Sequence, residues 1–242
     1  MKHFFDKRIV VLVCLNLGLY AAILLLDIRK AANLPETYDL IRSVLKYAAI
    51  VSCLLMCFFA FSHSRRKTAQ IQALVFCFTL GADFFLLFTG YFEAGVSVFL
   101  GAHICALIRY RRQWLLPACI IAAALFAALA LLLPVLSFAE PGAVLKAALC
   151  TAYGTLIISV TVSTFHSPQP QNSALFSRLG MLLFIMCDVN VMINNSLQES
   201  ILYTPSVVLM WAFYLPAQTL LALSATDFPL IEHRGQTADA PL

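Results

Sequence analysis

Two aspartates, Asp83 and Asp188, interrupt long apolar stretches of the sequence. A carboxyl group inside a membrane span costs on the order of 3 kcal/mol, so an aspartate at such a position is a candidate functional residue. Two neighbouring carboxyls can divide acid–base work, with one donating a proton and the other stabilising a cation or activating water. The sequence therefore predicts a catalytic pair. In the alternative interpretation, the two groups only join helices through hydrogen bonds.

Other polar side chains occur at similar depth in neighbouring apolar stretches and suggest a polar cavity. Tyr214 and Gln218 are four residues apart, so they share one helix face. Taken singly, each has a simpler explanation, because a buried His or Gln often satisfies a backbone group and Lys46 can extend to the interface. The candidate orienting or substrate-binding residues are Lys46, His103, Tyr153, Asn190, Tyr214 and Gln218.

No familiar metal, nucleophile or phosphate motif accompanies these residues. The sequence contains no HExxH, no G-x-S-x-G, no zinc-deaminase pattern and no glycine-rich phosphate loop. Of the histidines only His103 lies in a predicted span, and neither a His nor a carboxylate stands beside Cys53 and Cys57. We therefore expect no metal and no cofactor, and we interpret all eight cysteines as packing residues.

The composition is that of a multi-pass membrane protein. The chain has 242 residues, of which 12% are charged and 62% hydrophobic, and its mean hydropathy is +0.88. A soluble domain has about 25% charged residues and cannot hide this much apolar surface. The net charge of +4 comes from short basic clusters between apolar stretches, which indicates membrane topology and not nucleic-acid binding.

Eight stretches are long enough to cross the hydrocarbon core, which takes about 20 apolar residues. The sequence thus predicts an all-α bundle of eight transmembrane helices, in a single membrane domain that covers 1–242 and ends in a short polar tail at 226–242. The predicted spans are 9–26, 43–61, 69–88, 94–110, 114–136, 143–163, 176–194 and 205–225.

The basic residues predict the orientation of this bundle. Eight spans put both termini on one side, which then holds eleven Lys and Arg residues against five on the other, so both termini are expected in the cytoplasm. Asp27, Glu36 and Asp39 are expected in loops on the opposite side. We expect the membrane to be the plasma membrane.

Asp83 and Asp188 are expected at the same depth. Both of their spans run outward from the cytoplasmic side, with 14 residues from 69 to Asp83 and 12 from 176 to Asp188. At about 1.5 Å per residue, the two carboxyls lie about 21 and 18 Å from the starts of their spans. They can therefore meet in one layer.

The polar positions follow one another in a characteristic order along the spans. They are Lys46-Tyr47, Gly81-Ala82-Asp83, Gly101-Ala102-His103, Tyr153, Gly180 with Asp188, and Tyr214 with Gln218. In this order they resemble the YhhN/TMEM86 family of membrane lysoplasmalogenases, over most of residues 43–225. Departures from the family pattern include Tyr47 in place of Pro, Ala82 between Gly and Asp, and Cys187 in place of Ser.

The resemblance implies hydrolysis of the vinyl ether bond of a lysoplasmalogen, which releases a fatty aldehyde and a glycerophospho-head group. Asp83 and Asp188 would form the acid–base pair, and the substrate would be a lysophospholipid taken from the bilayer. His103, Tyr153 and Gln218 would orient the pair or the water, and Lys46 could meet a phosphate.

Two other functions stay open at this point. The protein could be a proton-coupled transporter of a small molecule or a lipid, with the two aspartates as its proton relay. It could also be a non-catalytic scaffold that binds lipid. Head-group preference and oligomeric state are left open.

Overall fold

The computed structural model describes residues 7–32, 38–60, 66–137, 141–196 and 200–226. This part of the chain forms eight α-helices with one π-helical and one 3-10 turn, and it contains no strand. The elements are α1 (Lys7–Ala31), α2 (Asp39–Ala60), α3 (Arg66–Phe84), η2 (Phe85–Thr89), α4 (Phe92–Arg111), η3 (Arg112–Trp114), α5 (Leu115–Ser137), α6 (Pro141–Phe165), α7 (Gln171–Ser196) and α8 (Tyr203–Leu223).

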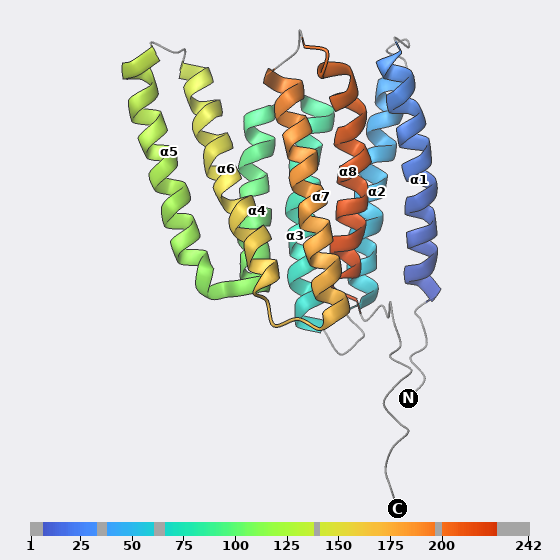
Figure 1. Cartoon of the computed structure of the whole chain (residues 1–242). Coiled ribbons are helices and arrows are strands. Elements are labelled where there is room, and N and C mark those ends of the chain that lie inside the picture. The colour runs from blue at the N-terminus through green and yellow to red at the C-terminus, as the bar shows by residue number, and fades with distance from the viewer. Residues whose placement is uncertain (1–6, 33–37, 61–65, 138–140, 197–199, 227–242) are drawn as a thin grey trace, which may run out of the picture.

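Seven helical segments in the described residues are long and apolar enough to cross a membrane. An all-α bundle of apolar helices is therefore confirmed, but the number of candidate spans is seven and not the predicted eight. The difference arises because α4 continues through η3 into α5, so Phe92–Leu133 forms one segment of 42 residues. Within it, α4 and α5 run in opposite directions, with the bend at η3 (Figure 1).

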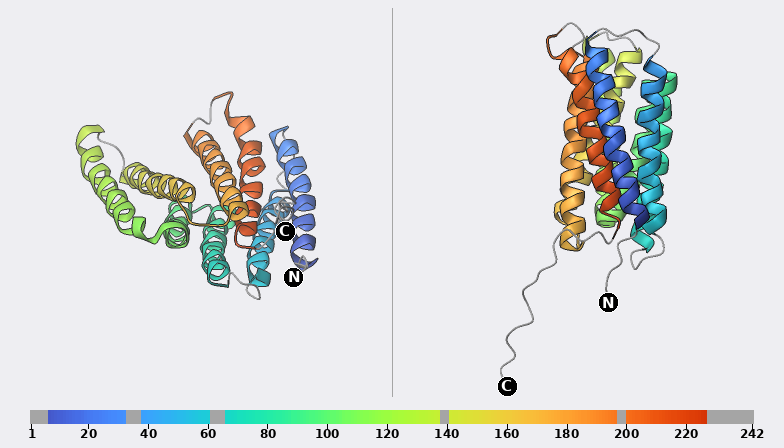
Figure 2. Two further views of the ribbon diagram at one scale, coloured as in Figure 1. Left: turned by 60° about the horizontal axis from the view of Figure 1, so that its bottom comes forward. Right: turned by 90° about the vertical axis from the view of Figure 1, so that its right-hand side faces the viewer.

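The helices run up and down along one bundle axis (Figure 1). α1 begins and α8 ends at the same end of the bundle, which we call the terminal end. α7 packs along α8, α3 along α4 and α5 along α6, while α5 and α1 lie at the two margins of the bundle (Figure 2). The predicted polar tail from 227 onward lies outside the described residues, as do Lys2, Arg65 and Arg234, on which the predicted orientation partly depends.

Glycines allow the two helix pairs that carry the aspartates to pack closely. A Cβ atom added to Gly180 of α7 would lie 2.9 Å from Leu221 Cγ of α8. One added to Gly101 of α4 would lie 2.7 Å from the Phe78 ring of α3. Small residues let membrane helices approach, because packing rather than the hydrophobic effect drives their association. These close contacts fix α3 and α7 against their neighbours.

Candidate functional site

Each of the two candidate aspartates accepts a hydrogen bond from a tyrosine on another helix. Tyr214 Oη of α8 donates to Asp83 Oδ2 of α3 over 2.8 Å. Tyr153 Oη of α6 donates to Asp188 Oδ2 of α7, also over 2.8 Å. Asp83 and Tyr214 are buried, while Asp188 and Tyr153 are partly buried. Four of the predicted site residues thus form two Asp–Tyr pairs.

The backbone departs from regular α geometry directly after Asp83. α3 ends at Phe84, the π-helical turn η2 follows, and Gly90 closes it with φ of 71°. A left-handed residue at this position suits glycine, which has no Cβ to clash. Single π turns are uncommon in proteins, and those that are found lie frequently at functional sites. The turn therefore marks the Asp83 end of α3 as a specialised part of the bundle.

An aromatic cluster lies between the two Asp–Tyr pairs. The His103 ring centroid is 4.9 Å from that of Tyr153 and 5.8 Å from that of Phe184. Phe184 in turn lies 5.6 Å from Tyr214. A continuous series of ring contacts therefore connects the tyrosine on Asp188 with the tyrosine on Asp83. We call Asp83, Asp188 and these four rings the carboxyl layer.

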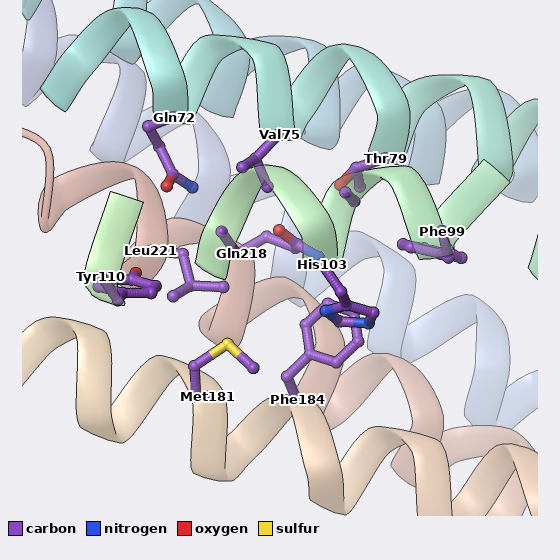
Figure 3. Close-up of a pocket in the computed structure, with 12 residues that line it drawn as sticks. Gln72, Val75, Thr79, Phe99, His103, Tyr110, Met181, Phe184, Gln218 and Leu221 are labelled. Atoms are coloured by element: carbon purple, nitrogen blue, oxygen red, sulfur yellow. The ribbon is translucent and has the colours of Figure 1, made fainter. Parts of the chain in front are cut away.

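A small cavity of about 20 Å³ adjoins the carboxyl layer (Figure 3). Its lining comes from α3, α4, α7 and α8, and it includes His103, Phe184 and Gln218. Gln218 lies one helical turn from Tyr214, as the spacing of four residues predicts. A cavity therefore lies next to the carboxyl layer, but most of its lining is apolar and neither aspartate lines it, so a polar cavity at the aspartates stays a prediction.

Lys46 is buried but does not face the carboxyl layer directly. Its Nζ donates to Asp27 Oδ1 over 2.8 Å, and Arg42 Nη1 contacts the same oxygen at 3.2 Å. The prediction that Asp27 belongs to an outer loop is wrong, because α1 continues past the apolar stretch to Ala31 and buries Asp27 completely. The missed signal is Lys46 itself, since a charge within a span needs a counter-charge at the same depth.

Trp211 connects this ionic cluster with the carboxyl layer, and sequence reasoning did not select it. Lys46 Nζ lies 4.8 Å from the centroid of the Trp211 ring. The Trp211 ring is in turn 4.9 Å from Tyr214, which binds Asp83. An aromatic residue in an apolar span looks like ordinary core, so only the fold identifies this contact.

Asn190 is the predicted site residue with the most local role in the structure. It is buried, and its Nδ2 donates to the Met186 carbonyl of its own helix over 2.7 Å. Within the described part of the chain, no three His, Cys, Asp or Glu side chains come together in a group that could hold a metal ion. The expectation of metal-independent activity stays a prediction.

The helices and the buried polar layer define a multi-pass membrane protein with an acidic site inside the bundle. The chain belongs to the YhhN family, whose model matches residues 41–225. This family includes lysoplasmalogenases. No curated protein and no solved structure matches the chain. The matched range contains every predicted site residue but not α1, so Asp27 comes from outside it.

Proposed function

We propose that the protein is an intramembrane hydrolase that cleaves the vinyl ether bond of a lysoplasmalogen. The products are a fatty aldehyde and a glycerophospho-head group. The observation that carries this proposal is the pair of carboxyls inside the bundle, one buried and one partly buried, each bound to a tyrosine hydroxyl at 2.8 Å, in a chain of the YhhN family. A membrane enzyme with its acids inside the bundle can act on the part of a lipid that lies in the hydrocarbon region.

The two carboxyls suit the chemistry of a vinyl ether. One carboxylic acid gives its proton to the vinyl carbon remote from oxygen, which leaves an oxocarbenium ion. Water then forms a C–O bond to the cationic carbon and gives a proton to the other carboxyl group, which is ionised. The resulting hemiacetal breaks its C–O bond to glycerol, which regains a hydroxyl proton, and the aldehyde leaves. This division of roles is analogous to that of glycosidase carboxyls.

The ionic cluster at Lys46 supports a position for the head group. Lys46, Arg42 and Asp27 lie in the half of the bundle opposite the terminal end, and Trp211 links them to the carboxyl layer. A phosphate near Lys46 and Arg42 would place the glycerol and its vinyl ether toward Asp83. We propose this direction of binding for a lysophospholipid.

Substrate analogues test the reaction. Purified protein in detergent should release aldehyde from an alkenyl lysophospholipid and nothing from the matched alkyl ether, which has no double bond to protonate. It should release no fatty acid from an acyl lysophospholipid. Fatty acid release from the acyl lipid without aldehyde from the alkenyl lipid would contradict the proposal.

We further propose eight membrane crossings with both termini in the cytoplasm, in the plasma membrane. The 42-residue segment supports this number, because at about 1.5 Å per residue it measures about 63 Å, twice the hydrocarbon thickness of about 30 Å. Reporter fusions after Leu242 and in the loop near Glu36 should report opposite sides of the membrane. Signals from the same side would contradict eight crossings.

Proton-coupled transport is the second candidate function. Pro216 lies inside the continuous helix α8 between Tyr214 and Gln218, and proline within a span close to intramembrane acids is a feature of many transporters. This alternative predicts proton-dependent uptake into proteoliposomes and no aldehyde from the wild-type protein.

A further inference from the structure

Two buried side-chain nitrogens in the cavity have no hydrogen-bond partner among the described residues. They are His103 Nε2 and Gln218 Nε2, in side chains from residues that are 4% and 1% exposed. Both residues line the cavity, and in Figure 3 the Gln218 amide extends toward the His103 ring. Buried polar groups in proteins nearly always have partners, and where the protein supplies none an ordered water usually does.

The cavity has the size of a site for one water molecule, and the two unpartnered nitrogens belong to residues of its otherwise mostly apolar lining. A water needs at least about 10–15 Å³ and two or more polar partners, and this cavity offers about 20 Å³. Water can accept a hydrogen bond from the Gln218 amide and donate one to His103 Nε2 when the imidazole proton is on Nδ1. We propose that His103 and Gln218 hold a single water molecule here, and that it is the water consumed in the proposed hydrolysis.

The position of the cavity fits this role, because it lies about one helical turn from the two aspartates, on the side of the terminal end. On three helices, a residue that lines the cavity stands four positions from an aspartate or its tyrosine, a distance of about one turn or 5.4 Å. The pairs are Thr79 and Asp83 on α3, Phe184 and Asp188 on α7, and Gln218 and Tyr214 on α8. The ionic cluster lies toward the opposite end, so water and head group would occupy different sides of the two acids.

This inference rests on the proposed function for the fate of the water. The water oxygen forms the new bond to the cationic carbon, and one water proton passes to the ionised carboxyl. His103 and Gln218 are positioning residues, since they bind the water and make no bond to substrate. The binding site itself exists independently of any substrate, and this allows a separate test.

Radiolytic hydroxyl-radical footprinting of the purified protein tests the site directly. Radicals formed from a bound water oxidise the side chains beside it, and methionine is among the most reactive of these. Met181 lines the cavity and is 3% exposed, whereas Met56 is 0% exposed and does not line it. We expect several-fold faster oxidation of Met181 than of Met56 in the wild-type protein. Equal oxidation rates of Met181 and Met56 in the wild-type protein would contradict a bound water in the cavity.

Two variants on different helices identify the residues that hold the water. Gln218→Leu and His103→Phe should each lower Met181 oxidation toward the level of Met56. Thr161→Val is the matched control, because Thr161 is buried, bonds its own helix at the Ile157 carbonyl and does not line the cavity. Unchanged Met181 oxidation in both variants, or an equal loss in Thr161→Val, would contradict the assignment.

A competing alcohol tests whether this water is the nucleophile. Wild-type protein should give aldehyde alone in dilute methanol, since the cavity admits one water. Gln218→Ala enlarges the cavity and should yield some methyl acetal. If the wild type forms the same proportion of methyl acetal as Gln218→Ala, the water in the cavity is not the nucleophile. Fast Met181 oxidation without any aldehyde release would support the water site and contradict the hydrolase. Aldehyde release with slow Met181 oxidation would support the hydrolase and contradict the water site.

Discussion

Three buried or partly buried aspartates in this bundle have two different kinds of partner. Asp27 faces two cations, with Lys46 Nζ at 2.8 Å and Arg42 Nη1 at 3.2 Å. Asp83 and Asp188 instead accept hydrogen bonds from the neutral hydroxyls of Tyr214 and Tyr153. Both kinds of partner favour the ionised form of a carboxyl, but two cations do so much more strongly than one neutral hydroxyl donor. The comparison separates a structural carboxylate from two that can exchange protons.

The same difference places different constraints on the two kinds of site. Breaking a buried ion pair leaves an uncompensated charge, so Asp27 and its cations must be kept or lost together. The Asp–Tyr pairs carry no such constraint on stability, since the amide of an Asn can accept the same hydrogen bond. Substitutions at the two kinds of site should therefore change different properties of the protein.

The largest effect is expected for Asp83→Asn and Asp188→Asn. Each should lower aldehyde release by about 10²- to 10⁴-fold, because Asn can neither donate a carboxylic proton nor become ionised. The double variant should be little worse than the worse single variant, since the two groups act as one unit. Both proteins should stay monodisperse in detergent. Near-wild-type aldehyde release from the two folded single variants would contradict a catalytic role and leave the aspartates only a role in joining helices.

Asp27→Asn should mainly lower stability, in contrast to the two aspartates that we propose as catalytic. Removing one partner of a buried ion pair typically costs about 3–5 kcal/mol, which thermal unfolding in detergent would detect. Asp39→Asn is the control, because the Asp39 side chain is 43% exposed where it pairs with Lys30 at 3.0 Å and with Arg42 at 3.2 Å, and pairs of an exposed carboxylate contribute about 0–1 kcal/mol. Folded Asp27→Asn should lose far less activity than Asp83→Asn. Equal stability of the Asp27 and Asp39 variants would remove the distinction between the sites.

The smallest effect is expected for Tyr214→Phe and Tyr153→Phe. Each removes one hydrogen bond to a carboxyl, worth about 0.5–1.5 kcal/mol, so aldehyde release should fall by up to about tenfold. The aromatic contacts with Phe184 and His103 stay in place, so stability should change little. Tyr203→Phe, at the start of α8 and 38% exposed, serves as the control. A tyrosine variant as inactive as the aspartate variants would assign the hydroxyl a direct chemical role.

Much of this arrangement follows from the sequence, because the length of an apolar stretch and the rise per residue of a helix together determine how deep a residue lies in the membrane. Counting residues along two spans places Asp83 and Asp188 near one layer, and a spacing of four places Tyr214 and Gln218 on one face. Which tyrosine meets which aspartate does not follow, since Tyr214 and Asp83 are 131 residues apart and only the tertiary arrangement of the bundle brings them together. Hydropathy alone also misplaced Asp27, because the helix continues beyond the apolar residues that reveal it.

The central claim is that two carboxyls without a cationic partner in the described part of the chain protonate the vinyl carbon, and the site of deuterium incorporation tests it most directly. Wild-type protein would be incubated with alkenyl lysophospholipid in D₂O, the aldehyde trapped at once by reduction, and the product analysed by mass spectrometry. Protonation at carbon predicts one deuterium on the carbon beside the former carbonyl, and no labelled product above background from Asp83→Asn or Asp188→Asn. Aldehyde without deuterium at that carbon, or labelled aldehyde at the wild-type rate from both variants, would contradict the account.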